Sequence, residues 1–185
     1  MNLLSAYFKY MREPAITMRA VLHARRLGQG VLGYACAALC MVLFFNIGGS
    51  VSPAVLFTKF VIVFAAELVL GYFVASLSGL FLDLAGAEAS PAEIFTLVGL
   101  AGFIKGLLVA FALIAAAQPA LSFLGPLAWL LVLGLQIGFL VKNLGRVYGV
   151  SGGKAFTSLL FAVLPVAAAF ALLLVFFIWF VAAAF

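Results

Sequence analysis

One stretch constrains the fold more than any other: residues 126–155 form a long apolar run that ends in basic residues. The run is long enough to cross a bilayer, which takes about 20 residues of helix. Lys142, Arg146 and Lys154 follow it with no acidic residue nearby. Lys and Arg concentrate in the cytoplasmic loops of membrane proteins, so this end is predicted to face the cytoplasm. Because the neighbouring loops are short, one oriented span also orients the others.

The composition extends this prediction to the whole chain. Hydrophobic residues make up 68 % of the 185 residues and charged residues only 8 %. A soluble domain has about 25 % charged and about 45–50 % apolar residues, so a water-soluble surface cannot be built here. The runs are apolar at both odd and even positions, which excludes a transmembrane β-barrel. The sequence therefore predicts an all-α, polytopic transmembrane bundle.

Turn and cap signals divide residues 29–185 into five predicted spans in one membrane domain. Ser52 and Pro53 are typical of a helix start, and Ser90 with Glu93 predicts a capping box at another. Gly149 is expected to end the fourth span, and Pro165 is expected to kink the fifth. The spans are predicted at about 30–47, 53–82, 91–117, 126–148 and 154–185.

The net charge of +5 is an orientation signal and does not indicate a nucleic-acid partner. Half of the basic residues precede the first span, so with five spans we expect a cytoplasmic N-terminus and an external C-terminus. The basic residues of this segment are Lys9, Arg12, Arg19, Arg25 and Arg26.

Residues 1–28 are predicted to lie along the membrane interface. Apolar side chains share one stripe of a helix over residues 2–12, with Lys9 and Arg12 away from it. The same stripe could instead dock on the bundle, and Pro14 is expected to start a second short helix. The stripe consists of Leu3, Leu4, Tyr7, Phe8 and Met11.

Small residues recur at spacings of four within three spans. Close helix contact in lipid depends on small residues, so these stripes predict packing faces, although membrane helices are rich in glycine in any case. The stripes are Gly71, Ala75 and Gly79 in span two, Gly102 and Gly106 in span three, and Gly134 and Gly138 in span four.

Glu67 and Lys105 are ionisable residues in the middle of spans two and three. A charge at this depth costs several kcal/mol and should face a partner or water. Counted from the loop that joins the two spans, the residues differ in depth by only about 3 Å. They are predicted either to form a structural pair that fixes helix register or to form a polar site for an ion, proton or lipid headgroup.

Other chemistry is sparse. His23 is the only histidine, and Cys36 and Cys40 lie one turn apart within a span, where we expect them to pack. A zinc-hydrolase site needs more ligands than this, and Gly152-Gly153-Lys154 is too short for a phosphate-binding loop. We therefore expect no catalytic residue, no metal and no cofactor, and a protein that is not an enzyme.

The order of several short motifs resembles the Yip1 family of small five-span membrane proteins. The chain differs from the family pattern at residues 86–88 and 103–104, and it lacks the long polar N-terminal region of eukaryotic members. The resemblance implies a five-span fold and a bacterial-type member, and with it a location in the bacterial inner membrane. The motifs are the proline-led basic helix at 14–22, Gly86, Glu93-Ile94-Phe95, Trp129, Gly138, the run from Tyr148 to Ala155, and Pro165.

Two functions are consistent with this pattern. The first is a non-enzymatic protein that organises the membrane or a membrane-protein partner, including further copies of itself. The alternative is a small transporter, channel or lipid-moving protein that uses Glu67 and Lys105. A laterally open cavity that reaches Glu67 would favour the alternative, and a dry Glu67–Lys105 contact would favour the first.

Overall fold

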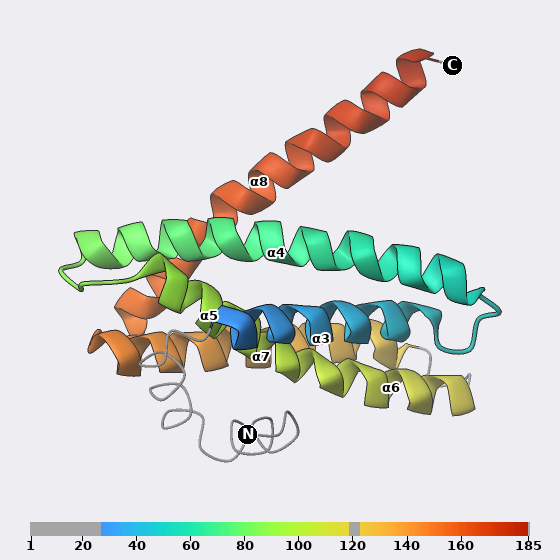
Figure 1. The fold of residues 1–185 in the computed structure, drawn as a ribbon, viewed down its shortest axis with the longest axis horizontal. Coiled ribbons are helices and arrows are strands. Elements are labelled where there is room, and N and C mark those ends of the chain that lie inside the picture. The colour runs from blue at the N-terminus through green and yellow to red at the C-terminus, as the bar shows by residue number, and fades with distance from the viewer. Residues whose placement is uncertain (1–26, 119–122, 185) are drawn as a thin grey trace.

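The structure is a computed structural model, and it describes residues 27–118 and 123–184. The described residues are helical, with short connecting turns and one 3₁₀ segment (Figure 1). The two helices expected before residue 27 lie outside the described residues. The elements are α3 (Leu27–Asn46), α4 (Pro53–Leu84), α5 (Pro91–Ala101), η1 (Gly102–Lys105), α6 (Gly106–Ala117), α7 (Leu124–Tyr148) and α8 (Gly152–Ala184).

The described residues contain five candidate membrane spans, as the sequence predicted. The spans α3, α4, the run α5–η1–α6, α7 and α8 are each long and apolar enough to cross a bilayer. Helices α4 and α8 have 32 and 33 residues, or about 50 Å at 1.5 Å per residue. The hydrocarbon core is about 30 Å thick, so these two helices must tilt or extend beyond it. Large apolar side chains such as Phe57 and Leu172 are exposed. The chain is therefore a multi-pass membrane protein.

The helix starts follow from local chemistry, with one exception. Ser52 caps α4 by accepting a hydrogen bond from the Val55 amide (3.4 Å), with Pro53 in the first turn. The capping box expected at Ser90 is wrong, because the Ser90 side chain makes no cap hydrogen bond. The Glu93 carboxylate instead accepts a hydrogen bond from the Tyr148 hydroxyl (3.3 Å). Gly149 adopts the left-handed conformation (φ 65°) that ends α7, as predicted.

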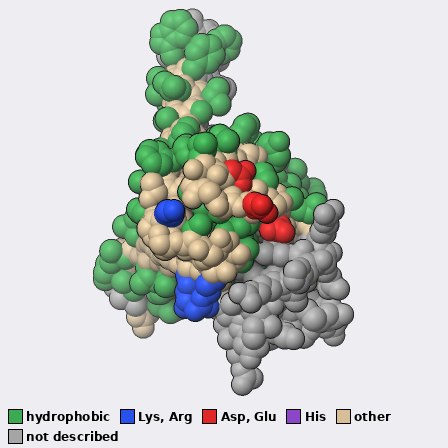
Figure 2. Space-filling view, turned by 90° about the vertical axis from the view of Figure 1, so that its left-hand side faces the viewer, with side chains coloured by type: hydrophobic (Ala, Val, Ile, Leu, Met, Phe, Trp, Pro, Cys, Tyr) green, Lys and Arg blue, Asp and Glu red, His purple; other side chains and the backbone are tan. Residues whose placement is uncertain are grey.

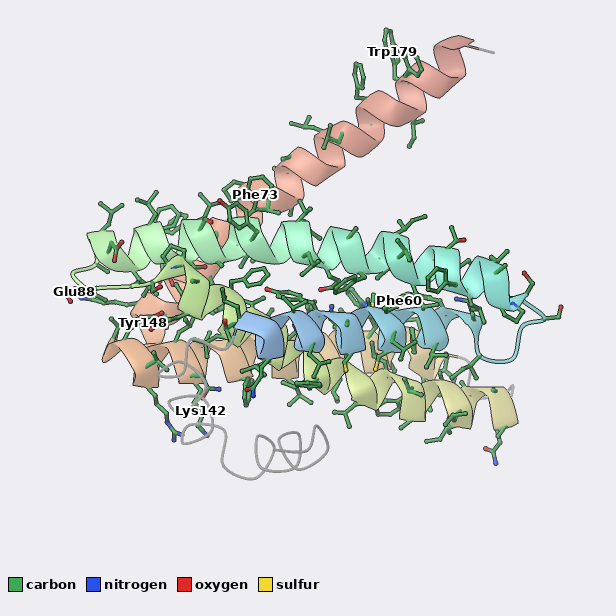
Figure 3. All side chains as sticks on the ribbon, in the orientation of Figure 1. Phe60, Phe73, Glu88, Lys142, Tyr148 and Trp179 are labelled. Atoms are coloured by element: carbon green, nitrogen blue, oxygen red, sulfur yellow. The ribbon has the colours of Figure 1, made fainter. Side chains whose placement is uncertain are left out.

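The helices α3 to α7 run lengthwise together, while α8 crosses them at an angle (Figure 1). The first half of α8 packs against α4 and α7, and Ala155 and Leu159 are buried there. The second half leaves the bundle, and Leu172 and Trp179 are exposed (Figure 3). Pro165 lies between these two halves of a continuous helix.

The tightest helix contact joins α3 to α5 through glycines. A Cβ on Gly33 would overlap the carbonyl oxygen of Gly99, and a Cβ on Gly99 would overlap that of Gly30. A Cβ on Gly102 would lie 2.9 Å from that of Ala37. Helix α3 is therefore the centre of the bundle, in contact with α4, α5, η1 and α6.

The expected small-residue stripes fall into two groups. In α4, Ala75 is buried, Gly71 lies under the ring of Tyr34, and Gly79 faces Pro91. On span three, Gly102 is buried and Gly106 is half-buried.

Gly134 and Gly138 differ from the rest of these residues. Both lie on an exposed face of α7, where no described atom outside the local helix backbone would come within 4 Å of an added Cβ. The packing face expected at these two glycines is therefore absent within the described chain, because four-residue spacing does not determine the direction that a helix face takes.

Candidate functional site

An ion pair joins span two to span three at mid-depth. The Nζ atom of Lys105, the last residue of η1, contacts Oε1 of Glu67 in the middle of α4. The two side chains keep 15 % and 21 % of their surface exposed, so the pair is only partly buried. The backbone of η1 packs against α3, α5, α6 and α7 and not closely against α4. The contact between the third span and α4 at this depth is therefore made by the long side chain of Lys105 and not by close packing of the two backbones.

Tyr34 of α3 lies beside this pair, and the sequence analysis did not single it out. Its hydroxyl donates a hydrogen bond to the carbonyl oxygen of Phe95 (3.1 Å), and the two rings lie 4.8 Å apart. Its ring occupies the space that a side chain at Gly71 would fill. Tyr34 thus fixes the spacing of α3, α4 and α5 near Glu67. The available signal was a tyrosine that directly follows Gly33 within span one.

A cavity of about 340 Å³ reaches the ion pair; we refer to it as the cleft. Its walls come from every span, and most of its lining is apolar. The polar side chains in the lining are those of Tyr34, Glu67, Lys105 and Gln136, with the indole of Trp129. The apolar lining residues include Met41, Leu70, Val74, Leu108, Val132, Leu133, Ile137, Leu140, Phe156, Leu159, Leu160 and Val163.

The cleft is open to the side. Helix α4 packs against α3, α5 and α8 but makes no extensive contact with α7. At the rim, Leu133 of α7 and Phe156, Leu160 and Val163 of α8 are 37–48 % exposed. These residues lie within candidate membrane spans, so we expect the opening to face the acyl chains of a bilayer.

One end of the bundle is held together by polar contacts between two loops; we call it the basic end, after Lys142, Arg146 and Lys154. The Tyr148 hydroxyl donates hydrogen bonds to the carbonyl oxygen of Ser90 (3.4 Å) and to Glu93 (3.3 Å). Lys154 Nζ donates to the carbonyl oxygen of Ala85 (3.5 Å). The loop before α5 is therefore tied to the end of α7 and the start of α8.

The charges at the basic end are separated. Figure 2 looks onto this end and shows the acidic side chains grouped together, away from the basic ones. Lys142 and Arg146 are exposed one turn apart on α7, and Lys142 points away from the bundle in Figure 3. Asp83 accepts a hydrogen bond from the Ala89 amide (2.7 Å), which orders the loop between α4 and α5.

At the opposite end, Lys59 donates a hydrogen bond to Asn46 (2.6 Å). Lys59 is exposed, and this bond ties the start of α4 to the end of α3. Cys36 and Cys40 are free and half-buried. Within the described ranges, no three His, Cys, Asp or Glu side chains come together as a metal site would require.

No protein-family model, no curated protein and no solved structure matches this chain. The resemblance to the Yip1 family therefore stays a prediction from the motifs. Three residues of those motifs, Glu93, Tyr148 and Lys154, lie together at the basic end. The described residues form a multi-pass membrane protein with five candidate spans and a laterally open, partly polar cleft.

Proposed function

We propose that this protein is non-enzymatic and takes an amphiphilic molecule from the bilayer into the cleft, where Glu67 and Lys105 hold its polar group. The observation that carries the proposal is the cleft itself: about 340 Å³, mostly apolar, open to the side and in reach of the ion pair. Ligand sites are commonly apolar cavities of about 300–1,000 Å³ with a few polar groups placed inside.

The position of the opening indicates where the ligand comes from. At the basic end, Tyr148 and Lys154 tie the loop before α5 to α7 and α8, whereas the rim at Leu133 and Leu160 is exposed within candidate membrane spans. A molecule that enters through this rim would leave the acyl chains without crossing a headgroup layer. Of the two functions consistent with the sequence, membrane organiser and lipid-moving protein, this geometry supports the second.

The organiser function has one observation of its own in support. Glu67 and Lys105 contact each other directly, and such a pair can fix the register of two spans. In that function the protein would resemble the Yip1 family, lie in the bacterial inner membrane with a cytoplasmic N-terminus, and assemble with itself or another membrane protein. The cleft would then be filled by bulk lipid chains.

Photolabelling separates the two functions. The protein is reconstituted in liposomes that contain diazirine derivatives of octadecanol, stearic acid or phosphatidylcholine, and the labelled residues are mapped by mass spectrometry. We expect saturable labelling at the rim residues Leu133 and Leu160, competed by the unlabelled compound. A cleft-blocking variant, Leu133→Trp, should remove this labelling.

Leu131→Trp is the matched control, because Leu131 lies on the same helix, is exposed, and does not line the cleft. It should leave the labelling at Leu160 unchanged. Labelling that is spread evenly over exposed residues such as Leu131 and Leu172, and that no compound competes, would contradict the proposal and favour the organiser.

A further inference from the structure

The polar groups in the cleft have hydrogen-bonding capacity that the described protein does not use. Lys105 has three N–H donors and gives one to Glu67, while Glu67 accepts only from Lys105 among described residues. The Gln136 carboxamide, on α7, makes no hydrogen bond to any described residue. An amide at membrane depth without a partner is unfavourable, since the hydrocarbon core supplies no water.

The charges in the cleft sum to zero. Glu67 and Lys105 neutralise each other, and Gln136 and Tyr34 are uncharged polar side chains. A ligand with a carboxylate or phosphate would therefore add an unbalanced charge near the bilayer centre, which costs several kcal/mol. A hydroxyl or carbonyl group adds none, and either can accept a hydrogen bond from Lys105 or Gln136; a hydroxyl can also donate one to Glu67.

The size of the cleft limits the hydrophobic part of the ligand. A volume of about 340 Å³ lies at the lower end of the range for ligand sites, about 300–1,000 Å³. Most of the lining is apolar, and it includes the exposed rim residues Phe156 and Val163. One aliphatic chain fits beside these apolar side chains and can leave through the rim, whereas the two chains and headgroup of a phospholipid need more room.

We propose, on the basis of the function above, that the ligand is a neutral single-chain lipid, such as a long-chain alcohol, whose hydroxyl or carbonyl group bonds to Gln136 and to the Glu67–Lys105 pair. Gln136 is the residue that selects a neutral hydrogen-bonding group, because its carboxamide can both donate and accept.

Quenching of Trp129 tests this ligand class. The chain has two tryptophans, and Trp179 lies on the outer half of α8, away from the cleft, so Trp179→Phe leaves Trp129 as a reporter in the lining. Dibrominated octadecanol, stearic acid and phosphatidylcholine are titrated into the detergent-solubilised protein. We expect saturable quenching by the alcohol, reversed by unbrominated octadecanol, at about tenfold lower concentration than quenching by the acid.

A variant then tests Gln136. In the Trp179→Phe background, Gln136→Leu should lower the affinity for the alcohol about two- to tenfold, which is the range for one lost hydrogen bond. The midpoint of thermal unfolding should stay unchanged. Asn46→Leu is the matched control: it removes a carboxamide bonded to Lys59 outside the cleft and should not change quenching.

The outcomes separate the two proposals. If the acid or the phosphatidylcholine quenches Trp129 saturably at the same concentration as the alcohol, the ligand is not restricted to neutral single-chain lipids. The cleft would still be a lipid site. An alcohol preference that survives Gln136→Leu unchanged would overturn the role of Gln136. If none of the three probes quenches Trp129 saturably, the proposed function is overturned as well.

Discussion

Gly33 and Gly99 bring the backbones of α3 and α5 into direct contact: a side chain on Gly33 would overlap the carbonyl oxygen of Gly99. Because backbone atoms cannot move aside as a flexible side chain can, this contact tolerates no added carbon. In lipid, helices gain little from burying apolar surface, so close packing of this kind carries much of the stability of the bundle.

The first prediction follows from this contact. Gly33→Ala should lower the free energy of unfolding by about 1–3 kcal/mol, the usual cost of overpacking. Gly134→Ala should leave stability unchanged or raise it, because nothing lies near an added Cβ there and alanine favours a helix. Thermal unfolding in detergent measures both. Equal effects of the two substitutions would contradict the packing described for α3.

The second prediction concerns the ion pair. Glu67→Gln and Lys105→Met should each destabilise the protein by about 2 kcal/mol, since each leaves the other charge without a partner. This is less than the about 3–5 kcal/mol of a fully buried pair, because both side chains remain partly exposed. The double substitution should recover part of the loss, which gives a non-additive cycle.

Lys59→Met is the control for this cycle. Lys59 bonds to the neutral Asn46, so its removal leaves no unpaired charge behind and should cost less than Lys105→Met. Additive losses for Glu67 and Lys105 would mean that the two side chains act independently, and Glu67 alone would then be the candidate for a proton or cation site.

The third prediction concerns the loop at the basic end. Tyr148→Phe removes the hydrogen bonds to Ser90 and Glu93 and should destabilise the protein by about 1 kcal/mol. Amide hydrogen exchange in residues 85–90 should become faster. Tyr72→Phe alters an exposed tyrosine on α4 and should change neither quantity. Unchanged exchange in Tyr148→Phe would show that Tyr148 does not hold the loop, which would then depend on the contacts of Asp83 and Lys154.

The fourth prediction is the topology, which rests on the basic residues. Reporter fusions in loops 83–90 and 149–153 should be cytoplasmic, because Lys142, Arg146 and Lys154 lie at that end. Fusions in loop 118–125 and after Phe185 should be external. A cytoplasmic reporter at Phe185 would mean that one of the five candidate spans does not cross the membrane.

The five spans could be predicted because their signals are local. The length of each apolar run can be read directly from the sequence. The helix start at Ser52 and Pro53 and the helix end at Gly149 depend only on the few residues around them. The capping box at Ser90 failed because Glu93 has a competing partner, Tyr148, that lies 55 residues away in sequence. A short motif cannot show such a partner.

The packing and the cleft were less accessible from the sequence. Gly33 and Gly99 belong to spans one and three, which are not sequential neighbours, so no loop length indicated their contact. Gly134 and Gly138 have the same spacing as glycines that do pack, yet face outward. Glu67 and Lys105 could be placed at one depth by counting residues, but the volume beside them depends on how far α4 and α7 stand apart.

The 3₁₀ segment η1 has a geometric consequence for the third span. Four residues in a 3₁₀ helix rise about 2 Å more than the same residues in an α-helix and turn about 80° further around the axis. Lys105 is the last of these residues, so its height in the membrane and the side toward which α6 faces are both set by the same four-residue segment. Neither can change without the other, because any change in the number of 3₁₀ residues shifts α6 along the span axis and rotates it about that axis at the same time.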